Sequence, residues 1–368
     1  MSHFDFGRFF RLTAASTLAG AAVLAQAAAP ELAANMTVFD GASPRELEIR
    51  LRPDSRMTVF TPEGQRETAV DVVWPANPSR EGWLALSAGY RRDDMRFNIG
   101  LPGGPNILSE LAWIAPALQI RADGSWTHAS GATIRGFLAY AHTYAKGQSQ
   151  DSDYALNDRQ AEFSRSYADT TGSEMFDALL GFGWQLPAGR WLTVTPLVGL
   201  ARYDSTYRTS NGRLVVSNAA NAALLGIPWN APLGPFPGLH SRYNPVWSSI
   251  WQGIDLEIKA GKRFSLRAGA RHHWFKYKAE ADWNLRGDFA HPVSFRHTDH
   301  GKGWEAEIEA SLALGHGHRL TLTAIQRDFK TRHGKDTTFY ANGGNSTIEL
   351  GEAVLASRAI QIGYRYEF

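Results

Sequence analysis

Residues 360–368, IQIGYRYEF, end the chain on a strict alternation. The even positions carry large apolar or aromatic side chains, from Ile360 to the terminal Phe368, whereas the odd positions are small or polar. A period of two indicates a β-strand with one apolar and one polar face. This pattern fits two architectures, the edge strand of a soluble sandwich and the last strand of a membrane-spanning barrel.

The rest of the chain favours the barrel. About ten alternating runs are expected to form strands, over residues 83–99, 109–126, 133–146, 174–186, 191–208, 246–260, 263–282, 303–314, 319–331 and 346–368. Short and long links alternate between them, as in barrels with short periplasmic turns and long outer loops. The 12 Trp and 12 Tyr suit aromatic belts at the membrane borders. We therefore predict an all-β fold, an antiparallel transmembrane β-barrel of about ten strands with long extracellular loops, in the cell outer membrane.

Three segments are expected along the chain. Residues 1–28 read as a secretory signal peptide, because two arginines precede a short alanine-rich apolar run and small-residue cleavage sites. Residues 29–80 carry short alternating runs broken by Pro, Gly and Asp, which predicts a β-rich periplasmic extension or a hairpin added to the barrel. Residues 81–368 form the expected barrel. The absence of Cys excludes disulfides and a thiol nucleophile, and the net charge of +2 gives no indication of nucleic acid.

The interior of such a barrel is expected to be filled. Ten strands enclose a narrow lumen that side chains can occupy. Arg267, Arg271 and His273 fall on one face of a predicted strand and suit a packed polar lumen, which disfavours a porin or a narrow channel. His272 and His273 point to opposite faces of that strand, and the other histidine-rich stretch, 315–318, has no acidic neighbours. We expect no metal site.

Four segments resemble the omptin family of outer-membrane aspartate-type proteases and occur in the family's order. They are residues 103–113, 151–154, 169–177 and 264–285. The resemblance extends over residues 83–368 and leaves the N-terminal extension without a counterpart. It implies a barrel of ten strands with a proteolytic site at its extracellular mouth.

In omptins an Asp-Asp couple faces an Asp-His couple across the mouth, and the His deprotonates a water that attacks the peptide bond. The resemblance places Asp151 and Asp153 in the first couple and Asp282 in the second. Neighbouring carboxylates raise each other's pKa, and a His titrates near working pH. Asn284 occupies the His position, and an amide cannot act as a base. Replacement by a histidine of the same loop, His291 or His300, remains open.

The resemblance also implies a need for lipopolysaccharide, with no other cofactor. Its phosphates would be bound by basic residues on the outer wall, and Arg202 and Arg208 are the candidates because Thr206 stands at the family's arginine position. The segment 209–245 is unusually apolar for an outer loop. It predicts contact with a partner or lipid, or a lid, and we expect a lid over the mouth.

Two functional hypotheses follow. Asn284 favours a catalytically altered omptin relative with a binding or structural role at the cell surface. The alternative is an active aspartate-type endopeptidase that cleaves near basic residues with a His from elsewhere. The expected partners are outer-membrane lipid, lipopolysaccharide and an extracellular peptide or protein, without nucleic acid.

Overall fold

The computed structural model describes residues 35–40, 43–48, 58–61, 64–67, 81–261 and 263–368. The predicted signal peptide lies outside these residues. The chain divides into two units, Met1–Ser79 with His128–Ser130, and Arg80–Thr127 with Gly131–Phe368. The described part of the first unit's N-terminal segment consists of two antiparallel hairpins, β1 (Asn35–Asp40) with β2 (Ser43–Glu48) and β3 (Thr58–Thr61) with β4 (Gly64–Glu67). Their periplasmic location stays a prediction.

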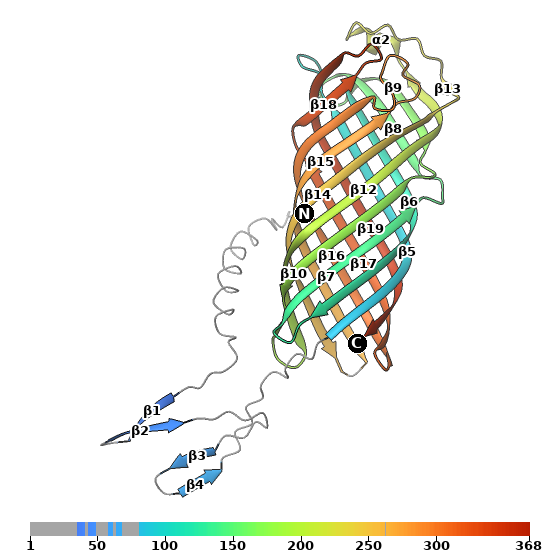
Figure 1. Ribbon diagram of the computed structural model, residues 1–368. Helices are drawn as coiled ribbons and strands as arrows, with labels where there is room; N and C mark the ends of the chain where they lie inside the picture. Colours follow the sequence, from blue (N-terminus) through green and yellow to red (C-terminus); the bar gives the residue numbers. More distant parts are fainter. Residues whose placement is uncertain (1–34, 41–42, 49–57, 62–63, 68–80, 262) are drawn as a thin grey trace. The chain divides into compact units, whose positions relative to one another are not determined.

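The second unit is a closed barrel of ten antiparallel strands (Figure 1). In ring order these are β5 (Glu81–Ile99), β6 (Ser109–Thr127), β7 (Ala132–His142), β10 (Glu174–Trp184), β12 (Leu192–Ser217), β14 (His240–Ala260), β15 (Phe264–Asp282), β16 (Phe295–Gly315), β17 (His318–Thr331) and β19 (Asn345–Glu367). The terminal strand closes the ring, because β19 pairs with β5 from Glu367 opposite Trp83 to Leu350 opposite Ile99. The predicted antiparallel barrel is confirmed.

Further elements raise the wall at one end of the barrel (Figure 1). They are β8 (Gln148–Leu156), β9 (Gln160–Asp169), β18 (Gly334–Phe339), the short β13 (Gly234–Pro235) and helix α2 (Ala219–Ala223), whereas the short β11 (Leu186–Pro187) pairs with the start of β12 at the other end. The β8–β9 hairpin is inserted between β6 and β12, and β18 lies between β16 and β19. Residues 147–173 and 332–345, which we expected to be loops, thus contain strands.

The outward face of the ring carries an apolar band. Its exposed residues include Leu84, Leu86, Leu118, Ile120, Leu138, Leu180, Leu200, Ile250, Ile308, Leu322, Ile360 and Ile362. Aromatic side chains border it, with Tyr90, Tyr140, Phe176, Trp274 and Trp304 towards the raised end and Trp126, Trp184, Trp191, Tyr366 and Phe368 at the other end. An apolar band between aromatic girdles is the outer surface of a barrel in lipid. In the described part of the chain, no helix is long and apolar enough to cross a membrane.

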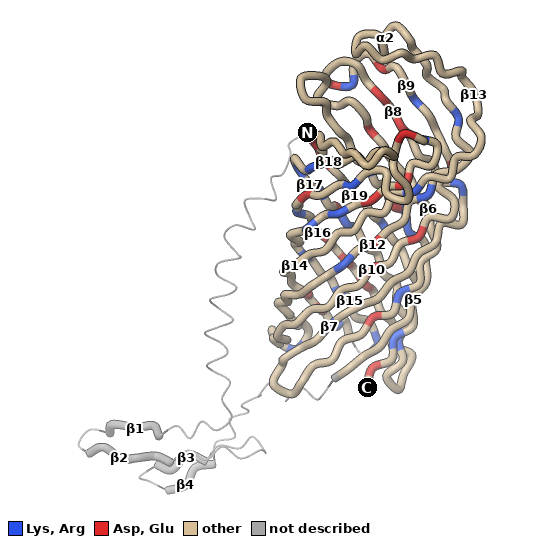
Figure 2. The backbone as a smooth tube through the Cα atoms, turned by 45° about the horizontal axis from the view of Figure 1, so that its top comes forward, with Lys and Arg blue, Asp and Glu red and all other residues tan. Residues whose placement is uncertain are grey.

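Paired charges fill the lumen at the level of this band. The inward-facing charged side chains there include Arg91, Arg121, Arg135, Arg267, Arg271, Arg327 and Arg365, with Asp93, Asp123, Asp177, Asp255, Glu305, Glu307 and Glu309. Arg91 binds Asp177 at 2.8 Å, and Arg121 binds Glu307 at 2.8 Å. The strands that contribute these charges surround the barrel axis (Figure 2). The predicted packed polar lumen, with Arg267, Arg271 and His273 buried inside it, is confirmed.

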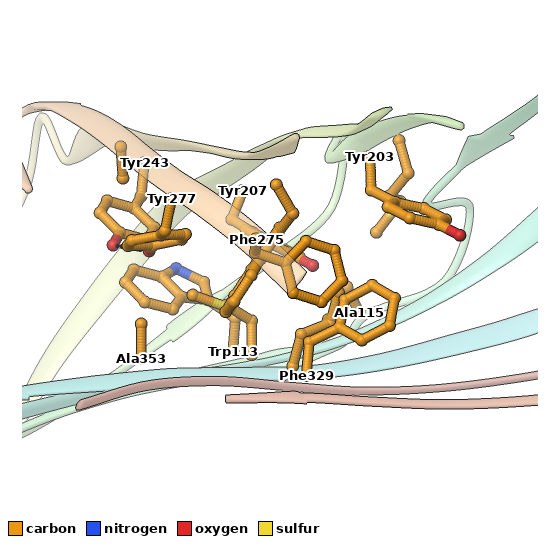
Figure 3. Packing of buried hydrophobic residues seen from close by; sticks show 14 of the residues in the cluster. Trp113, Ala115, Tyr203, Tyr207, Tyr243, Phe275, Tyr277, Phe329 and Ala353 are labelled. Carbon is orange, nitrogen blue, oxygen red and sulfur yellow. Dashed lines mark hydrogen bonds between the residues drawn. The ribbon is translucent and has the colours of Figure 1, made fainter. Parts of the chain in front are cut away.

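An aromatic layer lies between the charged lumen and the raised wall. Trp113 stacks on Tyr243 with ring centroids 5.0 Å apart and planes 2° from parallel. The rings of Phe275 and Phe329 continue the layer (Figure 3), and the ring of Trp247 packs against both of them. Because these side chains are almost fully buried, they occupy the barrel interior beneath the mouth.

Candidate functional site

Asp151 and Asp153 lie on β8 and face the interior of the raised wall. Asp151 stands opposite Leu111 of β6, and Asp153 stands opposite Ser109. Residues directly opposite each other on neighbouring strands share a face of the sheet. Because Leu111 belongs to the buried core of the barrel, both carboxyl groups point towards the inside of the barrel.

Burial controls the protonation of this acidic couple, which lies beyond the outer border of the apolar band. It raises the pKa of Asp151 well above its usual range, and the charge of Asp153 adds to the effect. Burial also raises the pKa of Asp153 to about 6, although hydrogen bonds from Ser109 and Ser164 oppose the shift. One carboxyl oxygen of Asp151, Oδ1, has no hydrogen-bond partner within the described residues. The couple can therefore hold a proton near neutral pH.

The cation that acts on both carboxyl groups is Arg286, from the link between β15 and β16. Its charge lowers the pKa of Asp151 and of Asp153. The guanidinium of Arg286 donates two hydrogen bonds to the Asp288 carboxylate, at 2.9 Å from Nε and 2.7 Å from Nη2. It also lies 3.9 Å from the ring centroid of Phe289. An arginine stays protonated in proteins. It can balance the couple's charge but cannot serve as a base.

Asp282 points away from this couple. It is the last residue of β15, and it follows Ala279 and Ala281, whose side chains belong to the buried core. Because side chains alternate along a strand, Asp282 lies on the outward face. Arg242, which stands opposite Asp282 on β14, forms an ion pair with it at 3.5 Å. The structure thus does not bring Asp282 to the face that carries Asp151.

The histidine that reaches Asp282 is His291. Its Nδ1 donates a hydrogen bond to the carboxylate at 2.7 Å, and its side chain is 41% exposed. Of the two replacements that sequence left open, His291 is therefore the one placed beside Asp282, on the outer side of the wall. His300 lies on β16, where its backbone N–H donates to Asp299. No pattern in the sequence predicted that the loop between β15 and β16 would bring His291 back to Asp282.

Asn284 has a structural position. Its Oδ1 accepts hydrogen bonds from the backbone of His240 at 2.9 Å and from Ser241 Oγ at 3.0 Å. Its Nδ2 donates to the carbonyl of Gly238 at 2.7 Å. The amide side chain therefore connects the end of β15 to the chain that enters β14. A histidine could not reproduce both the two acceptor contacts and the donor contact of one amide.

The two arginines predicted to bind lipopolysaccharide are both on the outer surface. Arg202 is 54% exposed and binds Asp204 at 2.8 Å. Arg208 is 49% exposed, donates from Nε to the carbonyl of Gly172 at 3.0 Å, and lies 3.6 Å from Glu174. Arg202 follows the apolar Leu200 by two residues on the same face of β12, at the outer border of the band. Lipopolysaccharide binding stays a prediction.

The apolar segment 209–245, where we expected a lid, folds onto the β8–β9 hairpin. Its first residues extend β12, and α2 follows. Ala222 and Trp229 pack with Phe163 of β9 in a small hydrophobic cluster. Phe163 lies at an irregularity of the β8–β9 pairing, between Glu162 opposite Tyr154 and Ser164 opposite Asp153. Ala155, two residues after the inward-facing Asp153 on β8, belongs to the same cluster. The segment therefore packs against the side of the hairpin that carries Ala155, and a lid over the mouth stays a prediction.

The histidine motifs do not assemble a metal site. His273 is buried, with Nδ1 3.0 Å from Ser249 Oγ, and His272 packs against Trp274 on the other face. Among the residues with described positions, no three His, Asp or Glu side chains form a group that could hold a metal ion.

The closed ring, the apolar band and its aromatic borders define an integral outer-membrane β-barrel. The model of a family described as Protochlamydia outer membrane protein matches residues 85–368. The chain belongs to this family, which supports the predicted outer-membrane location. No curated protein matches the chain.

A solved structure of an outer membrane protease supports the same fold. The outer membrane protease OmpT from Escherichia coli is similar over 78% of this chain and 97% of its own, with a TM-score of 0.64 and 12% sequence identity. The translocator domain of NalP from Neisseria meningitidis matches over 80% of this chain and 90% of its own, with a TM-score of 0.34 and 12% identity. OprG from Pseudomonas aeruginosa matches over 78% and 97%, with a TM-score of 0.30 and 10% identity. The likeness to OmpT is one of fold.

Proposed function

We propose that this chain is an omptin-shaped outer-membrane barrel without a proteolytic site, which has a binding or structural role at the cell surface. The observation that carries the proposal is the orientation of two carboxylates. Asp151 faces the interior of the raised wall, whereas Asp282 faces outward beside Arg242.

Peptide hydrolysis of the omptin kind needs a base within hydrogen-bond reach of a water that the acidic couple also contacts. The group whose charge acts on Asp151 and Asp153 is Arg286, which cannot accept a proton. The residue at the family's histidine position, Asn284, is engaged by Gly238, His240 and Ser241. The acidic couple thus faces a cation that cannot act as a base, and the side chain at the histidine position holds the strand ends together.

The raised wall offers the surface for binding. Around α2 it exposes Leu224 by 59% and Leu233 by 64%, while the same segment is anchored through Trp229. Exposed apolar side chains on a folded outer segment suit contact with an extracellular peptide or protein. Lipopolysaccharide at the outer border of the apolar band, beside Arg202, remains part of the proposal.

A second candidate function rests on the pair of Asp282 and His291. A carboxylate that orients an imidazole prepares it to act as a base. An endopeptidase would follow if the loop between β15 and β16 moved this pair to the inner side of the wall, next to Asp151.

A cleavage assay separates the two candidates. The refolded barrel, with lipopolysaccharide added, is incubated with fluorogenic dibasic peptides at neutral pH, beside Asp151→Ala and His291→Ala. We expect no cleavage by any of the three proteins. Cleavage by the native barrel that disappears in both variants would establish the endopeptidase and refute the proposal.

A further inference from the structure

The N-terminal extension contains the same sequence unit twice. Residues 36–56 and 57–77 are consecutive segments of equal length, and both begin with Met-Thr-Val-Phe. Both also carry Arg-Glu at the same offset from that start, at residues 45–46 and 66–67. Self-similarity at a fixed period is the sequence signature of a repeated structural unit.

The structure repeats with the sequence. Thr37 of β1 stands opposite Glu46 of β2, and Thr58, its equivalent on β3, stands opposite Glu67 of β4. Both hairpins also leave the same two-residue separation between their paired strands. Each sequence unit therefore forms one antiparallel hairpin, and the two hairpins share a single register.

Both hairpins have open strand edges. β1 with β2 and β3 with β4 form separate two-stranded sheets, and within the described ranges no other strand pairs with either of them. A lone hairpin is marginally stable in water, and its unpaired N–H and C=O groups are a template for another strand. The ring of the barrel is closed and offers no such edge. The extension is therefore the part of the chain best suited to gain a strand.

We propose that the extension associates with the extension of a second copy of this chain, through antiparallel pairing of β1 with β1 and of β3 with β3. Antiparallel pairing of two identical strands is two-fold symmetric, so one edge is complementary to itself. Thr, Val and Phe, which both strands share, favour strand conformation. This association is independent of any binding or proteolysis at the raised wall.

The membrane and the duplication both assist this pairing. Each extension joins its barrel at the start of β5, and barrels with one orientation in a membrane carry their extensions on the same side. Residues 68–80 separate β4 from β5 and can span up to about 45 Å, so two neighbouring barrels can be bridged. Once one pair of hairpins has formed, the second pair forms at an effective concentration in the millimolar range. Two weak contacts thereby give one stable dimer.

The register identifies the backbone groups at the open edges. Hydrogen-bonded and non-hydrogen-bonded pairs alternate along an antiparallel ladder, and the pair that flanks a two-residue turn is hydrogen-bonded. The pairs Thr37–Glu46 and Thr58–Glu67 are each the fourth from the turn, so their N–H groups point away from the hairpin. Proline at these positions removes a donor from an open edge but none from the hairpin itself.

Sedimentation of the refolded full-length chain in density-matched detergent tests the proposal. We expect a dimer for the native chain and about tenfold weaker dimerisation for Thr37→Pro/Thr58→Pro. The matched control, Glu46→Pro/Glu67→Pro, changes the opposite edges and should keep the native dimer. A shift in gel mobility on heating verifies that each barrel is folded. A native monomer would overturn the proposal, and so would a dimer that Thr37→Pro/Thr58→Pro leaves intact.

Cysteine crosslinking gives a second reading that leaves every backbone N–H in place. The chain contains no Cys, so an introduced thiol is the single site of reaction. A short bis-maleimide should join two chains of Thr37→Cys much faster than two chains of Glu46→Cys, because β2 lies on the far side of β1 from the pairing edge. Equal joining at the two positions would overturn the proposed pairing, even if both proline variants lose the dimer.

Discussion

Asp151 and Asp282 point to opposite faces of one barrel wall. Asp151 shares the inner face with Leu111, and Asp282 shares the outer face with Arg242. The two strands end at the same raised end of the barrel, so the difference arises from side-chain alternation and not from distance along the axis. An omptin-shaped fold can therefore keep both acidic positions in the sequence without forming one site from them.

Replacement of Asn284 tests its structural role. Asn284→Ala removes two acceptor contacts and one donor contact between β15 and the start of β14. We expect this substitution to lower the free energy of unfolding by about 1–3 kcal/mol. Asn284→His should lower it by a similar amount and should not gain peptidase activity. Urea unfolding of the refolded barrel measures the first effect. Activity gained in Asn284→His would show instead that the site lacks only its base.

The acidic couple makes stability depend on pH. Because the pKa of Asp153 is about 6 in the folded barrel, against 3.8 for an ordinary aspartate, the folded state binds more protons between these values. The free energy of unfolding should therefore decrease as pH rises from about 4 to about 6. Asp153→Asn should remove this part of the slope and stabilise the barrel at pH 8. Asp158→Asn, at an exposed position of the same hairpin, provides the matched control.

The lumen charges are predicted to be essential for stability. Glu305 accepts hydrogen bonds from Arg271 and Arg327 inside the barrel. Glu305→Gln leaves both guanidinium groups without that charge, which should cost about 3–5 kcal/mol. Unfolding in lipid vesicles measures the loss. On the outer surface Glu352 binds Arg96 and Lys330, and Glu352→Gln should cost less than about 1 kcal/mol. Equal losses would contradict the distinction.

The segment around α2 should unfold without the barrel. Trp229 packs edge-to-face on Phe163 with centroids 5.7 Å apart, and its Nε1 donates to Ser217 Oγ at 3.0 Å. Trp229→Ala should free residues 218–239, so that a protease added outside the cell cuts there while the barrel keeps its heat-dependent gel shift. Leu233→Ala changes a side chain that is 64% exposed and should leave cleavage at the native level.

Alternation in the sequence predicted the ring strands closely, because one face of each must meet lipid. The same rule failed for β8, whose residues 148–153 are polar on both faces. Its strand conformation depends on pairing with β6 and β9, which a local pattern does not contain. The outward orientation of Asp282 was present in the sequence, in its offset from Ala279 and Ala281. The approach of His291 was not, because it depends on the path of a loop.

The three glutamates of β16 also bear on how the barrel enters the membrane. Glu305, Glu307 and Glu309 occupy successive inward positions, and their basic partners lie on β6, β7, β15, β17 and β19. Ionised side chains are costly in hydrocarbon unless they are paired. A lone β16 would carry three uncompensated charges, and a hairpin with β15 would neutralise only part of them. Insertion of this strand should therefore coincide with closure of the ring, so that the barrel assembles in the bilayer as a whole rather than hairpin by hairpin.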